Sequence, residues 1–270
     1  MAAFTSAGSL WNTTAGTSTN KAVTATPVLN DLIVVIGGSS GLAGGVTSVT
    51  DNNTDGFGTT PGYTQIDVDR TGFSTTGVLT MWIRNRLIGS ATSTVFTAAQ
   101  NGSSGGGLEV CRVSGMSIVG LGAVRGAGGQ SSGGAGTTPA PILLRRVGTT
   151  FSGTQAALTA NLCIGVVMGG TATPAITEPG SWTESVDLSY TVPATGMETA
   201  FRNSGEIGST ITWGSTIATA FASMAIELDV SVPLLGYVNP AGGMGFSGKV
   251  PGVGAKNVVQ QGAVGRSATW

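Results

Sequence analysis

The chain has 270 residues, a length that suits one large β-sandwich or two small domains. Hydrophobic residues make up 40% of it, charged residues only 9%, and 45 positions are glycine, which excludes the charge-rich composition of a disordered chain. Lys and Arg number 12 against 13 Asp and Glu, so the net charge is −1 and no basic field is present to attract nucleic acid.

Catalytic chemistry has few candidates. The chain contains no histidine, which removes Ser-His-Asp and Cys-His catalysis and His-ligated zinc. Two Gly-x-Ser-x-Gly patterns, at 37–41 and 102–106, lack a base and are interpreted as Gly/Ser turns. We expect no enzyme activity, no catalytic residue and no cofactor. The competing enzyme hypothesis is a phage-tail polysaccharide depolymerase that uses two carboxylates.

Membrane and redox signals are weak. No apolar run reaches the ~18 residues of a membrane-spanning helix, and the N-terminal residues lack the pattern of a secretory signal. We therefore expect no membrane partner. Cys111 and Cys163 each lie in an apolar run, which favours buried free thiols over a disulfide.

In chain order, residues 1–27 are rich in Ser, Thr and Ala and are predicted to form an N-terminal arm. Trp11 is their expected anchor at a subunit interface. Residues 28–232 are predicted to form a β-sandwich, because short β-branched and aromatic runs alternate there with Gly, Asn, Asp and Pro. Helical periodicity is lacking, so the predicted fold class is all-β, with a jelly-roll-like sandwich.

The sandwich region contains a degenerate repeat, with one half over about 31–115 and the other over about 161–231. Two four-stranded halves are expected to face each other, joined by a Gly-rich crossover at 116–141. The alignment places Arg84 on Arg202. The matched segments are DLIVVIGG (31–38) with NLCIGVVMGG (161–170), MWIRN (81–85) with TAFRN (199–203), STVFT (93–97) with STITW (209–213), and VCRVS (110–114) with ELDVS (227–231).

One candidate metal site follows the TSVT run. Asp51, Asn53 and Asp55 fall at alternating positions before Gly56, as in the opening of a calcium loop. Gly62 stands where such a loop has its bidentate Glu. The main prediction is therefore a hairpin turn stabilised by Asn and Asp, with calcium as the alternative.

Residues 233–270 are predicted to form a C-terminal arm, since they are too Gly-rich for a helix and too apolar for a solvated tail. Their apolar anchors suit a segment that lies across a neighbouring subunit. Tyr237, Phe246 and Trp270 are the expected interface residues.

The sequence DLIVVIGG…GVTSVTDNN…LTMWIRN…STVFT…LEVCRVSGM resembles a family of Gly/Ser/Thr-rich jelly-roll proteins common among tailed-bacteriophage virion proteins. This resemblance covers about residues 31–231 and implies a structural role in a virion. The expected function is capsid decoration or cementing, with the major capsid protein, other virion subunits or further copies of the chain as partners. The alternative is a phage tail or receptor-binding protein that recognises a host glycan.

Overall fold

The computed structural model describes residues 2–12, 20–39, 45–53, 62–66, 78–100, 106–132, 142–146, 152–169, 176–191, 194–214 and 220–230. Compactness divides the chain into two units, Met1–Val230 and Ser231–Trp270. All the strands belong to the first unit, which we call the body. The second lies outside the described residues.

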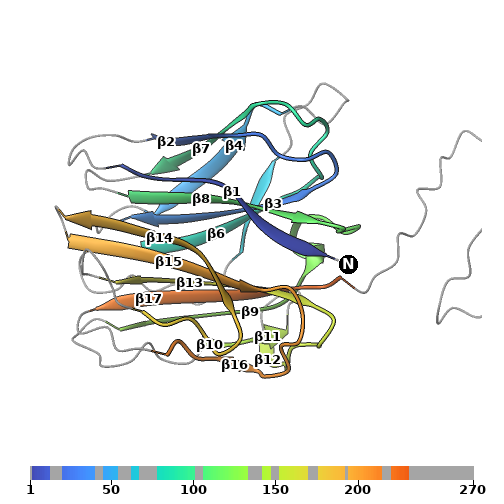
Figure 1. Ribbon diagram of the computed structural model, residues 1–270, viewed down its shortest axis with the longest axis vertical. Coiled ribbons are helices and arrows are strands. Elements are labelled where there is room, and N and C mark those ends of the chain that lie inside the picture. The colour runs from blue at the N-terminus through green and yellow to red at the C-terminus, as the bar shows by residue number, and fades with distance from the viewer. Residues whose placement is uncertain are drawn as a thin grey trace, which may run out of the picture. The chain divides into compact units, whose positions relative to one another are not determined.

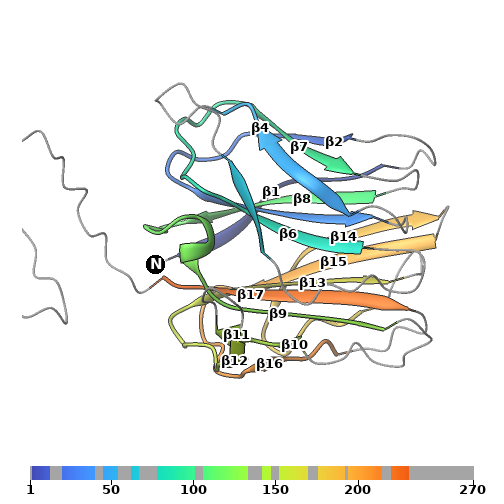
Figure 2. The same ribbon diagram turned by 180° about the vertical axis from the view of Figure 1, so that it is seen from behind.

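The body consists of antiparallel β-sheets stacked in layers, as Figure 1 shows from the front and Figure 2 from behind. The N-terminal half has an inner and an outer sheet. In spatial order the inner sheet contains β1 (Ala3–Asn12), β8 (Gly106–Ser114), β3 (Leu32–Ser39), β6 (Val78–Arg84) and β5 (Tyr63–Ile66). The outer sheet contains β2 (Asn20–Ala25), β7 (Thr94–Gln100) and β4 (Val46–Asp51).

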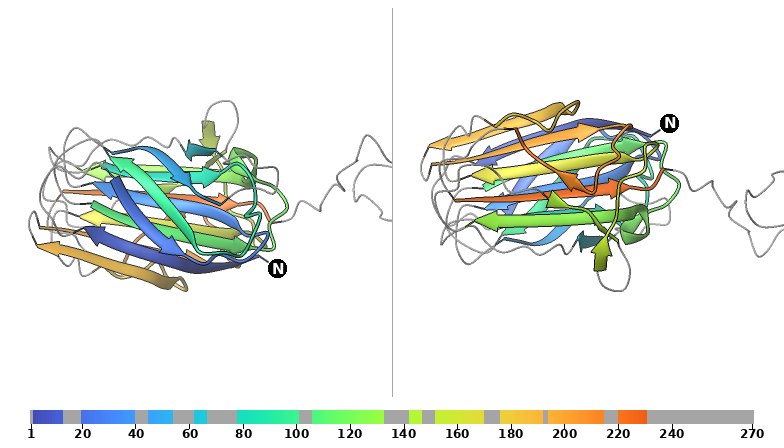
Figure 3. Two further views of the ribbon diagram at one scale, coloured as in Figure 1. Left: turned by 90° about the horizontal axis from the view of Figure 1, so that it is seen from above. Right: turned by 90° about the horizontal axis from the view of Figure 1, so that it is seen from below.

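The C-terminal half repeats this plan, and Figure 3 shows the two outer layers from above and below. It begins with the 3-10 turn η1 (Gly120–Ala123). Its inner sheet contains, in spatial order, β12 (Ser152–Thr154), β11 (Arg145–Arg146), β9 (Val124–Ser132), β17 (Phe221–Leu228), β13 (Leu162–Gly169), β15 (Ala194–Arg202) and β14 (Thr183–Thr191). Its outer sheet contains β10 (Ile142–Leu143) and β16 (Thr210–Ile211).

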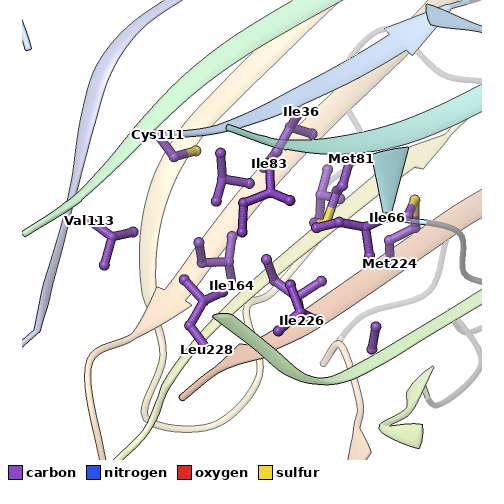
Figure 4. Close-up of a cluster of buried hydrophobic side chains, with 14 of the residues drawn as sticks. Ile36, Ile66, Met81, Ile83, Cys111, Val113, Ile164, Met224, Ile226 and Leu228 are labelled. Carbon is purple, nitrogen blue, oxygen red and sulfur yellow. The ribbon is translucent and has the colours of Figure 1, made fainter. Parts of the chain in front are cut away.

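Three apolar cores fill the spaces between these layers. The largest lies between the two inner sheets and joins the halves; Figure 4 shows Ile36, Ile83, Ile164 and Ile226 meeting there. A second core, around Phe96, separates the inner and outer sheets of the N-terminal half. The third lies on the outer side of the C-terminal inner sheet.

The layering explains the continuous apolar runs in the sequence. Along β3, Val34 faces the central core while Ile33 and Val35 face the N-terminal core. In β13, Ile164 faces the central core and Val167 the outer one. Strands that are buried on both faces have no reason to alternate apolar with polar residues. The all-β sandwich prediction is confirmed.

The internal repeat is visible in the strand pairing. In the N-terminal half β3 lies between β6 and β8, and in the C-terminal half β13 lies between β15 and β17. Arg84 and Arg202 end equivalent strands, as the alignment predicted, because Ile83 pairs with Val34 and Phe201 with Ile164.

The alignment of the closing strands is wrong by two residues. Ile33 pairs with Arg112, and its counterpart Cys163 pairs with Glu227, so Arg112 corresponds to Glu227. The sequence alignment had placed Arg112 on Asp229. A shift of two leaves every side chain on the same face of the sheet, so the apolar pattern cannot reveal it.

Three further predictions need correction. Residues 1–27 are not simply an arm, since β1 pairs with β8 and β2 with β7. The crossover 116–141 contains η1 and the whole of β9, which pairs with β17. The halves exceed four strands each, because each has an outer layer as well. These strands are hard to recognise in the sequence because small residues form much of them. One such residue is Gly8 of β1, where a Cβ would lie 2.9 Å from Val23 Cγ1 of β2.

No helix long and apolar enough to span a membrane occurs among the described residues.

Candidate functional site

The predicted hairpin turn, for which calcium binding was the alternative, belongs to a buried polar cluster. We call it the Arg84 cluster: Asp51, Asn53, Tyr63 and Arg84. The Arg84 side chain is fully buried, and its Nε lies 2.9 Å from Asp51 Oδ2. Nη2 donates to the Asn53 carbonyl at 2.8 Å, and Nη1 donates to the carbonyls of Arg86 and Leu87. The guanidinium thus fastens the end of β6 to the turn that follows β4.

Asp51 has both oxygens engaged. The Tyr63 hydroxyl donates to Oδ2 at 2.6 Å, and the backbone N–H of Asn53 donates to Oδ1 at 2.8 Å. Burial and then the neighbouring Asp51 carboxylate raise the pKa of Tyr63 well above its ordinary value. Tyr63 therefore stays a neutral hydrogen-bond donor.

Asn53 ties the same turn to the loop between β6 and β7. Its Nδ2 donates to the Ser90 carbonyl at 2.8 Å and to Thr94 Oγ1 at 3.2 Å, while Oδ1 accepts from the Gly89 N–H at 3.2 Å. The side-chain oxygens of Asp51 and Asn53 that the calcium alternative required are thus occupied by protein donors. Asp55, the third predicted ligand, lies outside the described residues.

The equivalent arginine of the C-terminal half is more exposed. Arg202 Nη1 lies 3.1 Å from Glu206 Oε2, and its side chain is 25% exposed. Trp182 Nε1 donates to the same carboxylate oxygen at 2.9 Å. Burial opposes ionisation of Glu206, but the hydrogen bonds from Trp182, Gly208 and Arg202 outweigh it and lower the pKa of Glu206.

A second pair of equivalent positions holds the loop before β3 and the loop before β13, with different side chains in the two halves: Asn161 stands for Asp31 and Glu227 for Arg112. In the N-terminal half Arg112 lies 3.7 Å from Asp31. In the C-terminal half Glu227 replaces the arginine and accepts from Asn161 Nδ2 at 2.7 Å, while Arg125 balances its charge at 2.6 Å. This equivalence is not apparent in the sequence, because it depends on the register in which the closing strands pair.

Polar and aromatic contacts join the two halves around the central core. The rings of Phe4 and Phe201 stack with centroids 4.3 Å apart, and Asn203 Oδ1 accepts from the Phe4 N–H at 2.8 Å. Asn85, the counterpart of Asn203, contacts the start of the C-terminal half: Gly120, with φ +58°, has no room for a Cβ, which would lie 2.9 Å from Asn85 Oδ1.

Glu109 of β8 also lies between the halves. It is fully buried and accepts a hydrogen bond from Ser185 Oγ at 2.6 Å. Burial raises the pKa of Glu109, which the hydrogen bond from Ser185 only partly offsets. The Glu109 carboxyl thus serves as a polar link between β8 and β14.

Of the predicted interface residues, only Trp11 belongs to the described part of the chain. Trp11 lies in β1, opposite Gly107 of β8, so its backbone belongs to a sheet. Tyr237, Phe246 and Trp270 lie outside the described residues. Cys111 and Cys163 are buried free thiols, as predicted. Burial is the first cause that raises the pKa of both thiols.

No protein-family model matches the chain, and no curated protein matches it.

Proposed function

We propose that this protein is a non-enzymatic structural component of a virion, a capsid decoration or cement protein that binds the major capsid protein or other virion subunits. The observation that carries this proposal is that buried charged side chains hold the body together. Arg84, Asp51 and Glu227 hold turns and strands together within the body. In this proposal the body is the support, and residues 231–270, which fall in the second unit, supply the contacts with neighbours.

We further infer that each half is one jelly roll. In the N-terminal half the inner-sheet order β1-β8-β3-β6 and the outer-sheet order β2-β7-β4 match seven of the eight strands of a jelly roll, while β5 pairs with β6 in the inner sheet instead of completing the outer one. The C-terminal half has the matching order β9-β17-β13-β15-β14. Jelly rolls are frequent in viral capsid domains, which supports the proposal by analogy of fold.

A deletion of residues 231–270 tests the role of the second unit. We expect the truncated chain to keep the β-sheet circular dichroism of the full chain and to lose binding to purified phage particles. Particle binding equal to that of the full chain would contradict the cement role, and would favour a tail or receptor-binding role.

A further inference from the structure

Four carboxylates gather at one edge of the C-terminal inner sheet, and we call this group the acidic edge: Glu178, Glu184, Asp187 and Glu198. Asp187 of β14 pairs directly with Glu198 of β15, and Glu184 pairs with Ala200. Directly opposed residues share a face, with Cβ atoms about 5 Å apart. Glu178 precedes β14, and after burial it is the first neighbour that raises the pKa of Glu184. Like charges placed in this way destabilise a sheet.

Glu198 shows that the group lacks a partner. The residue is only 3% exposed, and its Oε1 has no hydrogen-bond partner. Burial, followed by the negative charges of Glu178, Glu184 and Asp187, raises the pKa of Glu198 to about 8. No ion pair of the described residues involves any of the four.

The missing countercharge is better supplied by a side chain than by a metal ion. No cluster of three or more acidic, Cys or His side chains in the described part of the chain is arranged to hold a metal. A Lys or Arg side chain can reach several spaced carboxylates in turn through its long stem and multiple donors.

The backbone at this place is also open to a partner. β14 is the last strand of its sheet, so one side of it has no hydrogen-bonded strand among the described residues, although β1 of the facing sheet lies near it. An extended segment can pair with such an edge through main-chain hydrogen bonds while its side chains meet the flanking groups. The site therefore suits a basic, extended peptide.

Residues 231–270 have this chemistry. They contain Lys249, Lys256 and Arg266 and no Asp or Glu, so this segment carries a charge of +3 and the remaining chain −4. The segment is also rich in glycine, which gives an extended backbone little steric hindrance.

We propose that the acidic edge binds residues 231–270 of a second copy of this chain, with Lys249, Lys256 and Arg266 supplying the countercharge. This inference rests on the proposed function only for the choice of a neighbouring copy as the donor. It predicts self-association of the purified chain that weakens as salt is added.

Zero-length carbodiimide cross-linking of the full chain tests the proposal, using a mixture of isotope-labelled and unlabelled protein. We expect cross-links from Lys249 or Lys256 to Glu178, Glu184 or Asp187, with labelled and unlabelled peptides joined in the same product. The paired variant Glu184→Gln/Asp187→Asn should lose them and shift sedimentation toward the monomer. Cross-links confined to one chain, or none at these residues, would overturn the proposal.

A charge exchange supplies the matched control. Glu184→Lys/Asp187→Lys should abolish association, and adding Lys249→Glu/Lys256→Glu should restore it. Failure of the exchange to restore association contradicts the proposal, as does calorimetric binding of Ca²⁺ that is lost in Glu184→Gln/Asp187→Asn. Cross-linking and sedimentation use the purified protein alone. Self-association can therefore be absent while the chain still binds phage particles, and particle binding can be absent while self-association remains.

Discussion

At the residue scale, charged side chains hold turns and strands together. The free energy lost when one member of a pair is removed depends on how deeply the pair is buried. The side chains of Arg84 and Asp51 are both fully buried. Arg202, the counterpart of Arg84, and its own partner Glu206 are partly exposed. A buried ion pair that loses one member leaves an unpaired charge inside the protein, but a partly exposed pair leaves a group that water can solvate.

We therefore expect Arg84→Ala to lower the free energy of unfolding by about 3–5 kcal/mol. The matched variant Arg202→Ala should lower it by no more than about 1 kcal/mol. Urea unfolding of the two variants beside the wild type measures both values. Equal losses in the two variants would contradict the fastening role assigned to Arg84.

Glu198 gives a pH dependence of stability. Its pKa is about 8 in the folded chain, above the ordinary 4.5, so the folded state binds its proton more tightly than the unfolded state. Stability from this group is thus fully present below the unfolded pKa and is lost as the pH rises through the folded value. Among the described residues, the charged groups that face it are Glu178, Glu184 and Asp187.

Glu198→Gln should accordingly reduce the fall in melting temperature between pH 5 and pH 9, and each kcal/mol retained corresponds to roughly 2–4 °C for a body of this size. The variant should keep part of this fall, because Glu109, whose pKa burial also raises, is unchanged in it. Differential scanning calorimetry of both proteins at the two pH values checks the difference. An unchanged slope in Glu198→Gln would exclude Glu198 as its source.

At the element scale, close packing between the sheet layers depends on glycine at particular points. A Cβ at Gly37 of β3 would collide with Val46 Cγ2 of the outer sheet and lie 3.3 Å from Thr80 Oγ1. Gly180 has no atom within 4 Å of the same position and offers a control.

Gly37→Ala should destabilise the body by about 1–3 kcal/mol, as overpacking of a core does. Gly180→Ala should change stability by less than about 1 kcal/mol, since it meets open space. The denaturant midpoints of the two variants, measured beside the wild type, test this difference. Equal shifts of the midpoint would mean that the outer sheet moves to accommodate the added methyl group.

Much of this element structure was predictable. The strands β3, β6 and β13 stand out as apolar runs, and the Arg84–Arg202 alignment is correct. The closing strand expected at 227–231 is wrong in its bounds, because β17 spans Phe221–Leu228. β1 and β9 escaped prediction because small residues form them, and their burial depends on partners distant in sequence. Long-range pairing also decided the Arg84 cluster: the sequence placed Asp51 and Asn53 together but gave no sign that Arg84 and Tyr63 would enclose them.

At the scale of the whole molecule, the central core unites the two halves into one body. Ile83 and Val113 of the first half and Ile164 and Leu228 of the second share that core. Separating the halves would expose it to water, so we expect both to unfold in one cooperative transition.

Hydrogen exchange measures that cooperativity. Core amides of β8 and β17 should exchange with opening free energies within about 1 kcal/mol of each other, because both require global unfolding. A β17 that exchanges far more readily than β8 would mean that the C-terminal half opens on its own.

Quantitative mass spectrometry of purified phage particles tests the proposed virion role of this protein most directly. A decoration protein covers the shell, so we expect a copy number comparable to that of the major capsid protein, and loss of the chain from particles assembled with residues 231–270 deleted. Absence of the chain from particles would contradict a virion role, and a copy number matching the tail proteins would contradict capsid decoration.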